Sequence, residues 1–388
     1  MIRCQNHKDR LMSRNVEKFI NTIFNNAGIK INGSNPWDIK VHDPRFFPRI
    51  TSHTSVGFGE AYMEGWWDCE QLDTCIEKIF NSNLMNYGNQ NVWQLFQFAY
   101  FYFQNRILNP QSIKKAYDVG TVHYDLGNDL FLAMLDPTMS YSCGYWKKAS
   151  NLEQAQIDKL KLICEKLELQ PGMKLLDIGC GWGGLAVFAA ENYGVEVTGI
   201  TISKQQYDYA IERCKNLPIK ILFQDYRTPL PHKFDRLVSV GMFEHVGQKN
   251  YHEFMKIAAK TLDDDGLFLL HTIGNNISAS STDPWLDKYI FPHGMLPSVK
   301  QIGQAIENLF VMEDWHNFGA DYDKTLLAWH SKFVENWSLL KNKYDQRFYR
   351  MWKFYLLSCA GCFRARKIQL WQIVLTKAGK AGGYHSFR

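Results

Sequence analysis

The chain has 388 residues, of which 46% are hydrophobic and 21% are charged. This balance excludes a disordered protein, and the length predicts two domains or one heavily decorated domain. The formal net charge of +5 is mild, so charge alone does not require a nucleic-acid partner. Aromatic residues make up 14% of the chain, which suits either a large aromatic core or an apolar substrate.

The sequence lacks the features of a membrane-targeting segment. Residues 1–8 have no apolar stretch of the signal-peptide type, and no run approaches the ~18 apolar residues of a membrane span. The nine cysteines are scattered and odd in number, as in a reducing compartment. Cys359 and Cys362 form a single C-x-x-C in a helical pattern, which we interpret as two core thiols rather than half of a zinc site. We therefore predict a cytoplasmic protein without a metal site.

Residues 1–115 are expected to form a small, mainly helical domain. Turn-forming residues gather in this part of the chain at 32–36 and 43–44. Residues 92–103 are apolar except for two glutamines, so as a helix they would be buried nearly all round or would lie against lipid. Burial within the protein is the more common arrangement for such a segment and is the interpretation we favour.

From Ser150 onward, helical and strand patterns alternate. Ser150 with Glu153 predicts a helix N-terminus through a capping box, and Ser203 with Gln206 predicts another. Alternation of this kind predicts a doubly wound, mostly parallel α/β sheet in a second domain, residues 116–388. The five strand patterns fall at 173–178, 195–200, 219–224, 234–240 and 267–273.

After the fifth strand the pattern becomes less regular. Residues 274–300 are punctuated by proline and glycine, which suits a lid or a substrate channel. Helical patterns follow at 298–309 and 324–360. A final strand-like run, Ile368–Thr376, is expected to close the sheet as an edge strand.

The most informative segment is Lys174–Gly184, in which an apolar strand ends at Asp177 and opens into a glycine-rich turn. Glycine lets the backbone approach a bound nucleotide closely. The turn also matches G-x-G-x-x-G, a weak signal for a nicotinamide cofactor, which needs an acid after the next strand. That strand is instead followed by Thr201-Ile202-Ser203, without a carboxylate. The turn therefore favours an S-adenosylmethionine site over a nicotinamide site.

Polar or glycine-rich residues follow the C-terminal end of each predicted strand. Ligands of open α/β sheets bind at this edge, so we place the functional site there. The residues are Asp177 and Gly179, Thr201, Gln224 and Asp225, Gly241 to Glu244, and His271 to Ile273.

A basic, aromatic helix is predicted near the C-terminus. Eight basic residues and one acid, Asp345, lie between Lys341 and Lys367, with apolar residues at helical spacing opposite much of this charge. One interpretation is a solvated cationic face over a packed apolar face. The other is attraction to anionic lipid headgroups, worth ~1 kcal/mol per basic residue near a membrane. No motif for reading nucleic acid accompanies the charge, so lipid ranks before nucleic acid.

Several further segments, together with the glycine turn, carry a family resemblance. The most specific are Tyr141–Trp146 (YSCGYW), Gly241–Gly247 (GMFEHVG) and Asp314–Tyr322 (DWHNFGADY); Gly59–Trp67, His123–Asp129 and His271–Gly274 also match. On these residues the chain resembles the cyclopropane-fatty-acyl-phospholipid synthases. These enzymes use S-adenosylmethionine to add a methylene across a cis double bond of a lipid acyl chain. The resemblance extends from about Asn32 to Thr376.

The resemblance implies a fold, partners and ligands. It implies a catalytic domain of the Rossmann-like methyltransferase type, an N-terminal domain that engages lipid, a homodimer, and peripheral association with the inner face of a membrane of unsaturated phospholipids. It implies bicarbonate as the proton-abstracting base, held by Cys143, Glu244, His271, Ile273 and Tyr322. The S-adenosylmethionine contacts expected from it and from the strand ends are Tyr141, Ser142, Asp177, Gly179, Gly181, Gly183, Thr201, Ile202, Ser203, Gln206, Asp225, Tyr226 and Arg227.

Without the resemblance, the expected catalytic residues have ordinary structural interpretations. His271 on an apolar strand suits a core histidine, Cys143 a small buried hydrophobe, Glu244 a helix-start acid and Tyr322 a packed aromatic. Three rival functions follow: a methyltransferase that stops at simple methylation, a non-catalytic lipid-binding protein and, ranked last, a nicotinamide oxidoreductase.

Overall fold

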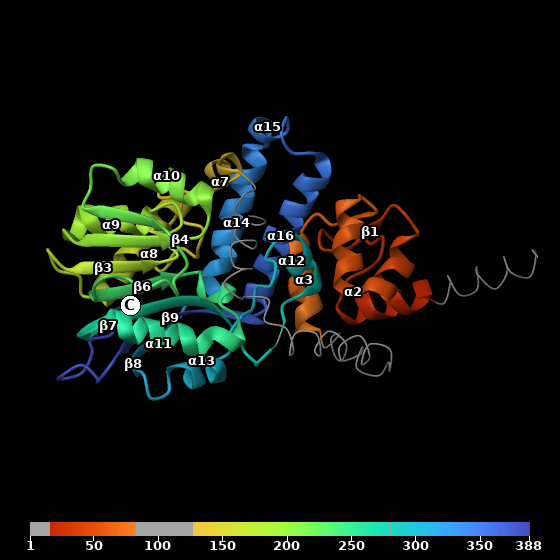
Figure 1. Ribbon diagram of the computed structural model, residues 1–388. Coiled ribbons are helices and arrows are strands. Elements are labelled where there is room, and N and C mark those ends of the chain that lie inside the picture. The colour runs from red at the N-terminus through yellow and green to blue at the C-terminus, as the bar shows by residue number, and fades with distance from the viewer. Residues whose placement is uncertain (1–15, 83–126, 280) are drawn as a thin grey trace, which may run out of the picture. The chain divides into compact units, whose positions relative to one another are not determined.

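The computed structural model describes residues 16–82, 127–279 and 281–388 (Figure 1). Contacts divide the chain into two compact units. Within the described ranges, the first unit comprises residues 16–82, 283–290 and 338–367, and the second comprises the remainder. The division at residue 115 that the sequence predicts lies outside the described residues, as does the apolar segment 92–103.

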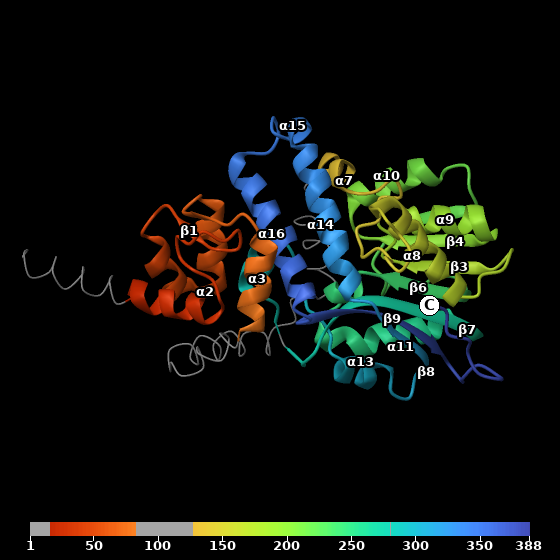
Figure 2. The ribbon, with the colours of Figure 1, turned by 180° about the vertical axis from the view of Figure 1, so that it is seen from behind.

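The second unit is built on a seven-stranded sheet (Figure 2). β9 alone runs in the opposite direction to the other six strands of the sheet: it pairs antiparallel with β7 and with β8, and the remaining neighbouring strands pair in parallel. In spatial order the strands are β5 (Ile219–Phe223), β4 (Glu196–Thr201), β3 (Lys174–Ile178), β6 (Phe234–Val240), β7 (Leu262–Asn275), β9 (Ile368–Thr376) and β8 (Val311–Asn317). The predicted doubly wound, mostly parallel sheet is confirmed.

Helices cover both faces of this sheet because successive side chains of a strand point to opposite sides. Leu176 of β3 packs with α11 and α13, whereas its neighbour Leu175 packs with α8 and α9. The helices of the unit are α7 (Asn128–Met134), α8 (Leu152–Lys166), α9 (Gly184–Tyr193), α10 (Lys204–Cys214), α11 (Tyr251–Thr261), α13 (Val299–Ile306) and α14 (Ala320–Glu335), with the short 3₁₀ turns η2 (Phe243–His245) and η3 (Gln248–Asn250). Buried apolar side chains therefore fill two layers, one on each side of the strands.

The structure corrects three predictions about individual elements. Ile368–Thr376 is a strand, but it lies between β7 and β8 and is not an edge; β8, whose VMEDWHN sequence lacks a clear strand pattern, takes that place. The first capping residue is Asn151, whose side chain accepts from the N–H of Gln154, and not Ser150. The helical pattern 324–360 is divided, because α14 ends at Glu335 and a new helix begins at Gln346. Ser203 does cap α10, as predicted, but the capping box is incomplete because the N–H of Ser203 donates to Thr201 and not to Gln206.

The first unit is mainly helical around an aromatic core. It contains a helix over 16–26, α2 (Phe46–Met63), α3 (Leu72–Asn81), α12 (Pro284–Tyr289) and α16 (Gln346–Arg364), with the two-residue strands β1 (Lys40–Val41) and β2 (Trp67–Asp68). Helix α16 packs against α2 and α3, and α12 packs against α2. The ring of Trp67, for example, stacks on Phe58 with ring centroids 4.3 Å apart and meets Phe354 of α16 edge-on.

Part of the positive charge on α16 is used inside the first unit. The guanidinium of Arg350 donates to the carbonyl of Trp67 at 2.9 Å and pairs with Asp68 at 2.7 Å, and Arg364 pairs with Asp73 at 2.7 Å. Lys341, Lys343 and Arg347 are exposed, and the charges of Lys343 and Arg347 also lie over the rings of Tyr344 and Tyr289, at 5.2 and 5.7 Å from the ring centres. No helix in the described parts of the chain is both long and apolar enough to cross a membrane.

Candidate active site

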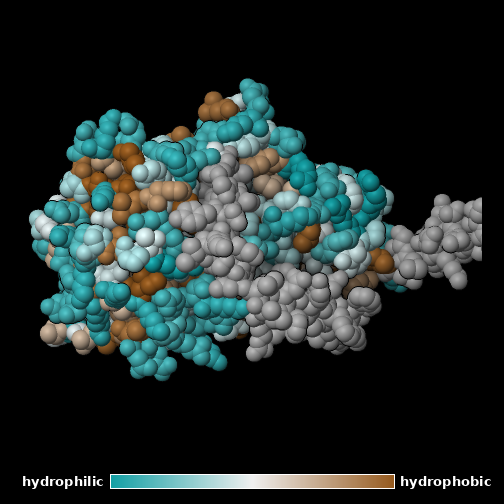
Figure 3. All heavy atoms as spheres, in the orientation of Figure 1, coloured by the Kyte–Doolittle hydropathy of each residue, from teal (hydrophilic) through white to brown (hydrophobic). Residues whose placement is uncertain are grey.

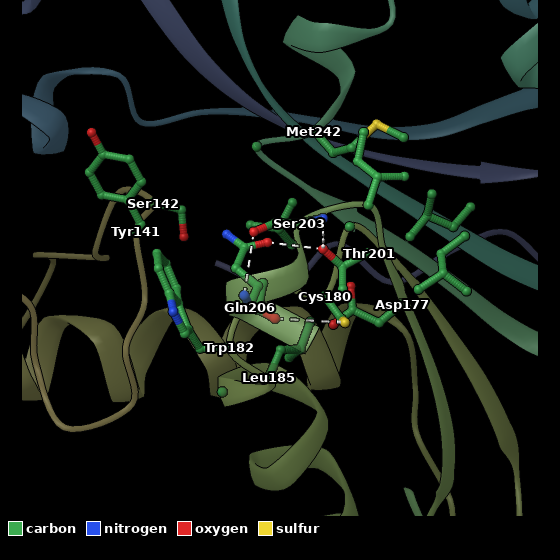
Figure 4. A pocket seen from close by; sticks show the side chains of 18 of the residues that line it. Tyr141, Ser142, Asp177, Cys180, Trp182, Leu185, Thr201, Ser203, Gln206 and Met242 are labelled. Carbon is green, nitrogen blue, oxygen red and sulfur yellow. Dashed lines mark hydrogen bonds between the residues drawn. The ribbon is translucent and has the colours of Figure 1, made fainter. Parts of the chain in front are cut away.

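A cavity opens at the carboxyl ends of β3, β4 and β6, the edge at which the sequence places the site (Figure 4). All of the expected S-adenosylmethionine contacts line it except Gly183, which caps α9. Four segments that are distant in sequence contribute these residues: Tyr141–Ser142, Asp177–Gly181, Thr201–Gln206 and Asp225–Arg227. Gly241 and Met242, after β6, also line the cavity. The fold therefore brings together positions that the sequence only lists in order.

The glycine turn after β3 has the backbone conformation that its composition predicts. Gly179, Gly181 and Gly183 have φ angles of 88°, 54° and 80°, in the left-handed region that favours glycine. The N–H groups of Gly179 and Cys180 both donate to the carbonyl of Ile200 at 3.0 Å, which joins the turn to β4. A Cβ on Gly181 would meet no described atom within 4 Å. Gly181 lines the cavity, and the space beside its backbone is open.

Hydrogen bonds between side chains order the loop after β4. The hydroxyl of Thr201 donates to Oε1 of Gln206 at 3.0 Å and accepts from the N–H of Ser203 at 3.2 Å (Figure 4). The hydroxyl of Ser203 in turn accepts from the N–H of Gln206 at 3.3 Å. These three buried residues form a polar wall of the cavity whose groups are already held in place.

The loop after β5 is shaped by an ion pair. Arg227 donates through its backbone N–H and its Nε to Oδ1 of Asp225, at 2.9 and 2.7 Å, and through Nη2 to Oδ2 at 2.7 Å. The guanidinium carbon also lies 5.1 Å from the centre of the Tyr226 ring. The carboxylate of Asp225 is therefore engaged by Arg227, and the aromatic face of Tyr226 stands beside this pair at the edge of the cavity.

Lys159 is a cavity residue that the sequence analysis missed. It lies on α8 and is 2% exposed, and its Nζ donates to Oγ of Ser142 at 3.0 Å. One turn earlier, Nε2 of Gln156 donates to the carbonyl of Ser142 at 2.8 Å. A signal was present: Gln156 and Lys159 fall at helical spacing with Ile163, on the apolar face of α8. Two polar residues on a core-facing stripe indicate a buried polar function.

Cys143, expected to be catalytic, is fully buried in an irregular segment that α14 holds in place. Its Sγ lies 3.7 Å from the hydroxyl of Thr325. That same hydroxyl accepts from the N–H of Gly144 at 3.1 Å and from the indole N–H of Trp146 at 2.9 Å. Tyr322 is on the same helix, one turn before Thr325. Burial raises the pKa of the Cys143 thiol well above its usual value, which keeps it protonated at neutral pH.

Glu244 and Ile273 are in direct contact. The N–H of Ile273 on β7 donates to Oε1 of Glu244 on η2 at 2.7 Å, while Oε2 of Glu244 is buried without a hydrogen-bond partner among the described residues. Burial raises the pKa of Glu244 to about 7. This side chain therefore exchanges a proton near neutral pH, with one oxygen available to a ligand.

His271, like Glu244, has one buried polar atom without a hydrogen-bond partner among the described residues. Nε2 of Gln372 on β9 donates to its Nδ1 at 3.2 Å, so the neutral ring carries its proton on Nε2. That Nε2 is buried and has no partner in the described parts of the chain. Burial lowers the pKa of His271 well below its usual value, which keeps the ring neutral. The ring nitrogen Nε2 of His271 and one oxygen of the Glu244 carboxyl are thus buried without a hydrogen-bond partner among the described residues.

None of the five expected catalytic residues lines the cavity itself. Two of them adjoin it in sequence: Cys143 follows the cavity-lining Ser142, and Glu244 lies between the cavity-lining Met242 and His245. The other three are His271 and Ile273 on β7 and Tyr322 on α14. The N–H of Ile273 donates to Glu244, and Thr325 of α14 accepts from the N–H of Gly144, next to Cys143.

Comparison with known proteins identifies relatives of this chain. The family model for mycolic acid cyclopropane synthetase matches residues 111–373. The cyclopropane-fatty-acyl-phospholipid synthase of Escherichia coli strain K12 is 53% identical over 94% of each chain. A probable fatty acid methyltransferase of Pseudomonas putida is 38% identical over 68% of this chain and 70% of its own.

A solved structure shares the fold as well as the sequence. The mycolic acid cyclopropane synthase CmaA1, complexed with SAH and CTAB, superimposes with a TM-score of 0.63 at 33% identity, covering 67% of this chain and 98% of that one. This structural match and the family model both extend far beyond the glycine turn, so the similarity does not depend on that turn alone. The chain therefore belongs to the mycolic acid cyclopropane synthetase family, which includes the cyclopropane-fatty-acyl-phospholipid synthases, and it is an enzyme of the methyltransferase fold.

Proposed function

We propose that this enzyme transfers a methylene group from S-adenosylmethionine across the cis double bond of unsaturated acyl chains in membrane phospholipids, forming cyclopropane rings. The observation that carries the proposal is the 53% identity, over nearly the whole chain, to a relative named for this activity. The cavity at the strand ends and the unpaired groups of Glu244 and His271 supply the chemistry that such a reaction needs.

The cavity fits S-adenosylmethionine. The open space beside Gly181 allows a ligand to lie against the backbone of the turn, and Thr201, Ser203 and Tyr226 offer hydroxyls and an aromatic face. When bound, this cofactor supplies a methyl group on a positively charged sulfur, an electrophile strong enough to react with an alkene. The protein's part is to hold that methyl beside the acyl chain in a site closed to water.

The buried polar groups fit bicarbonate. The proton on Nε2 of His271 suits an anion as acceptor, and Oε2 of Glu244 accepts from, or when protonated donates to, an oxygen of the same ion. Cys143 and the hydroxyl of Tyr322 would complete the cradle. When bound, bicarbonate supplies a small base for removing a proton from the delivered methyl group. Glu244 and His271 would orient it and tune its basicity.

Burial of these residues also serves the chemistry. Addition to an alkene leaves positive charge on carbon, and water would capture it as an alcohol. Cys143 and His271 are almost completely inaccessible, and Glu244 and Tyr322 are each less than 9% exposed. Such a site holds polar groups in fixed positions while it excludes bulk water, which favours proton removal and ring closure over hydration.

The direct test is to incubate the purified protein with S-adenosylmethionine and vesicles of a monounsaturated phospholipid, and to analyse the acyl chains by mass spectrometry. The expected product gains one methylene and loses the olefin. Depletion of bicarbonate should then lower the rate, and its addition should restore it. Proven cofactor binding with no lipid product would overturn the assignment of the substrate.

The second candidate function is methylation without ring closure, which the Pseudomonas putida relative favours by its name. The same experiment separates the two reactions, because simple methylation followed by loss of a proton gives a branched chain that retains a double bond. A methylation that retains a double bond also releases a proton, so the buried Glu244 and His271 suit both reactions and the product decides between them.

We further propose that the enzyme binds peripherally to the cytoplasmic face of a membrane and acts as a homodimer. The exposed Lys341, Lys343 and Arg347 support attraction to anionic headgroups. Beside them, Leu339 in α15 (Trp337–Leu340) is 75% exposed. The visible surface is mostly hydrophilic, and a small hydrophobic patch stands near α15 at the top of Figure 3. The family resemblance supports the dimer, which light scattering of the purified protein would test.

A further inference from the structure

Lys159 is an incompletely paired cation in the wall of the cavity. A lysine ammonium has three protons to donate, and among the described residues only Oγ of Ser142 accepts one. The side chain is almost fully buried, and buried lysines are normally paired with an acid. An ammonium group in this position leaves two donors for a ligand.

Asp177 is its counterpart in the same cavity. Its carboxylate is 2% exposed and accepts no hydrogen bond from a described residue. Burial raises the pKa of Asp177 to about 7, an effect that the charge of Lys159 partly offsets, and lowers the pKa of Lys159 to about 8, an effect that the charges of Asp136 and then Asp177 partly offset. Besides the ion pair of Arg227 with Asp225, the cavity lining therefore includes one cation, Lys159, and one anion, Asp177, that are short of hydrogen-bond partners among the described residues.

A cation and an anion that both lack partners match an amino-acid zwitterion. S-adenosylmethionine carries such a group at one end and an adenosine at the other. We infer that Lys159 binds the carboxylate of the cofactor's amino-acid end, with the hydroxyl of Ser142 as second donor and Asp177 as counter-charge to the ammonium. This inference rests on the proposed function, and it gives Lys159 a binding role.

Bicarbonate is the other anion that the proposed reaction would bring near Lys159. The contacts favour the cofactor carboxylate. Nζ of Lys159 bonds the side chain of Ser142, which lines the cavity, whereas Cys143, Glu244 and His271 do not line it. Gln156 also holds the Ser142 carbonyl, so the hydroxyl beside Lys159 has a fixed position.

The test is calorimetric titration of the full chain with S-adenosylhomocysteine and with its decarboxylated analogue, for the wild type, Lys159→Met and Lys166→Met. Lys166 is a matched control, because it lies seven residues later on α8 and is equally buried. Its Nζ lies 3.5 Å from Oδ2 of Asp314, and it does not line the cavity. Lys159→Met should lower the affinity for S-adenosylhomocysteine by about 10- to 100-fold, the range for a charged hydrogen bond. Lys159→Met should change the affinity for the decarboxylated analogue less than threefold. Lys166→Met should leave the affinities for both ligands unchanged.

Several results would overturn the inference. Equal affinity of the wild type for the two ligands would do so without any variant, which covers the case in which Lys159→Met fails to fold. Equal losses for both ligands in Lys159→Met would indicate a structural role. If Lys159→Met binds S-adenosylhomocysteine normally but needs more bicarbonate for turnover, Lys159 binds bicarbonate and not the cofactor carboxylate. A wild type that binds neither ligand would refute the proposed function as well.

Discussion

The N–H of Ile273 donates to Oε1 of Glu244 across 2.7 Å, and this contact fixes a buried carboxyl group between η2 and β7 while its other oxygen stays unpaired. Glu244→Gln preserves the acceptor for Ile273 but removes the titrating group. We expect turnover to fall about 100-fold or more, the range for loss of an acid–base group, with S-adenosylhomocysteine affinity within threefold of the wild type. Product formation and calorimetry measure the two quantities. The exposed Glu253→Gln serves as control, and normal turnover in Glu244→Gln would remove Glu244 from the mechanism.

The same variant should change how stability depends on pH. The pKa of Glu244 is about 7 in the folded protein, above its ordinary value of 4.5, so the folded state holds the proton between these values while the unfolded state releases it. Stability from this group is therefore lost as pH rises from about 4.5 to 7. Relative to the wild type, Glu244→Gln should gain about 2–3 kcal/mol over this interval, measured by urea unfolding at pH 5 and pH 7.5. A constant difference would contradict the raised pKa.

Thr325 should behave as the anchor of the segment that carries Cys143. Thr325→Val keeps the shape of the side chain but leaves the N–H of Gly144 and the indole N–H of Trp146 without their acceptor. Each buried donor left unpaired costs about 1–3 kcal/mol. We expect a loss of about 2–4 kcal/mol in the free energy of unfolding and a lower turnover number. Thr325→Ser, which restores the hydroxyl, should recover most of both; if it does not, the hydroxyl is not the anchor.

Gly181 and Gly172 form a matched pair for testing the glycine turn. Both have positive φ, 54° and 83°, and a Cβ on either would meet no described atom within 4 Å. Alanine at either position should therefore cost about 1–2 kcal/mol of stability through backbone strain. Only Gly181 lines the cavity. Gly181→Ala should lower S-adenosylhomocysteine affinity at least tenfold and Gly172→Ala should not, so equal affinities would place the cofactor elsewhere.

The exposed charges before and at the start of α16 should govern adsorption to anionic vesicles. Changing Lys341, Lys343 and Arg347 together to glutamine removes charges worth ~1 kcal/mol each at a membrane surface. Adsorption to anionic vesicles should weaken about 100-fold and lose most of its salt dependence, as measured by sedimentation with vesicles at several salt concentrations.

The control for this experiment is a second triple variant of exposed lysines, Lys256, Lys260 and Lys300, which lie in the other unit. It should retain adsorption. Arg350 is unsuitable for the test because its contacts with Trp67 and Asp68 make it a structural residue. Unchanged adsorption in the first triple variant would place the lipid surface in another part of the chain.

Local pattern alone predicted six of the seven strands of the central sheet, all except β8, and the sheet edge at which the cavity opens. The apolar run 174–178 and the glycines after it predict a strand and a close backbone turn because both depend on the residues themselves. The same holds for Ser203, whose hydroxyl caps a helix that begins at the next residue. The strand-end pattern also selected Glu244, His271 and Ile273, whereas Cys143 and Tyr322 follow no predicted strand and came from the family-specific segments alone.

Tertiary structure decided the features that depend on contacts between distant segments. The strand pattern of Ile368–Thr376 is the same at an edge or in the interior, and only pairing with β7 and β8 places it between them. The helical spacing places Lys159 on the core-facing stripe of α8, but only the packing of α8 against the Ser142 segment gives it the hydrogen bond to Ser142 and a place in the cavity lining. The raised pKa of Glu244 likewise follows from burial, which is a property of the folded protein and not of the residue.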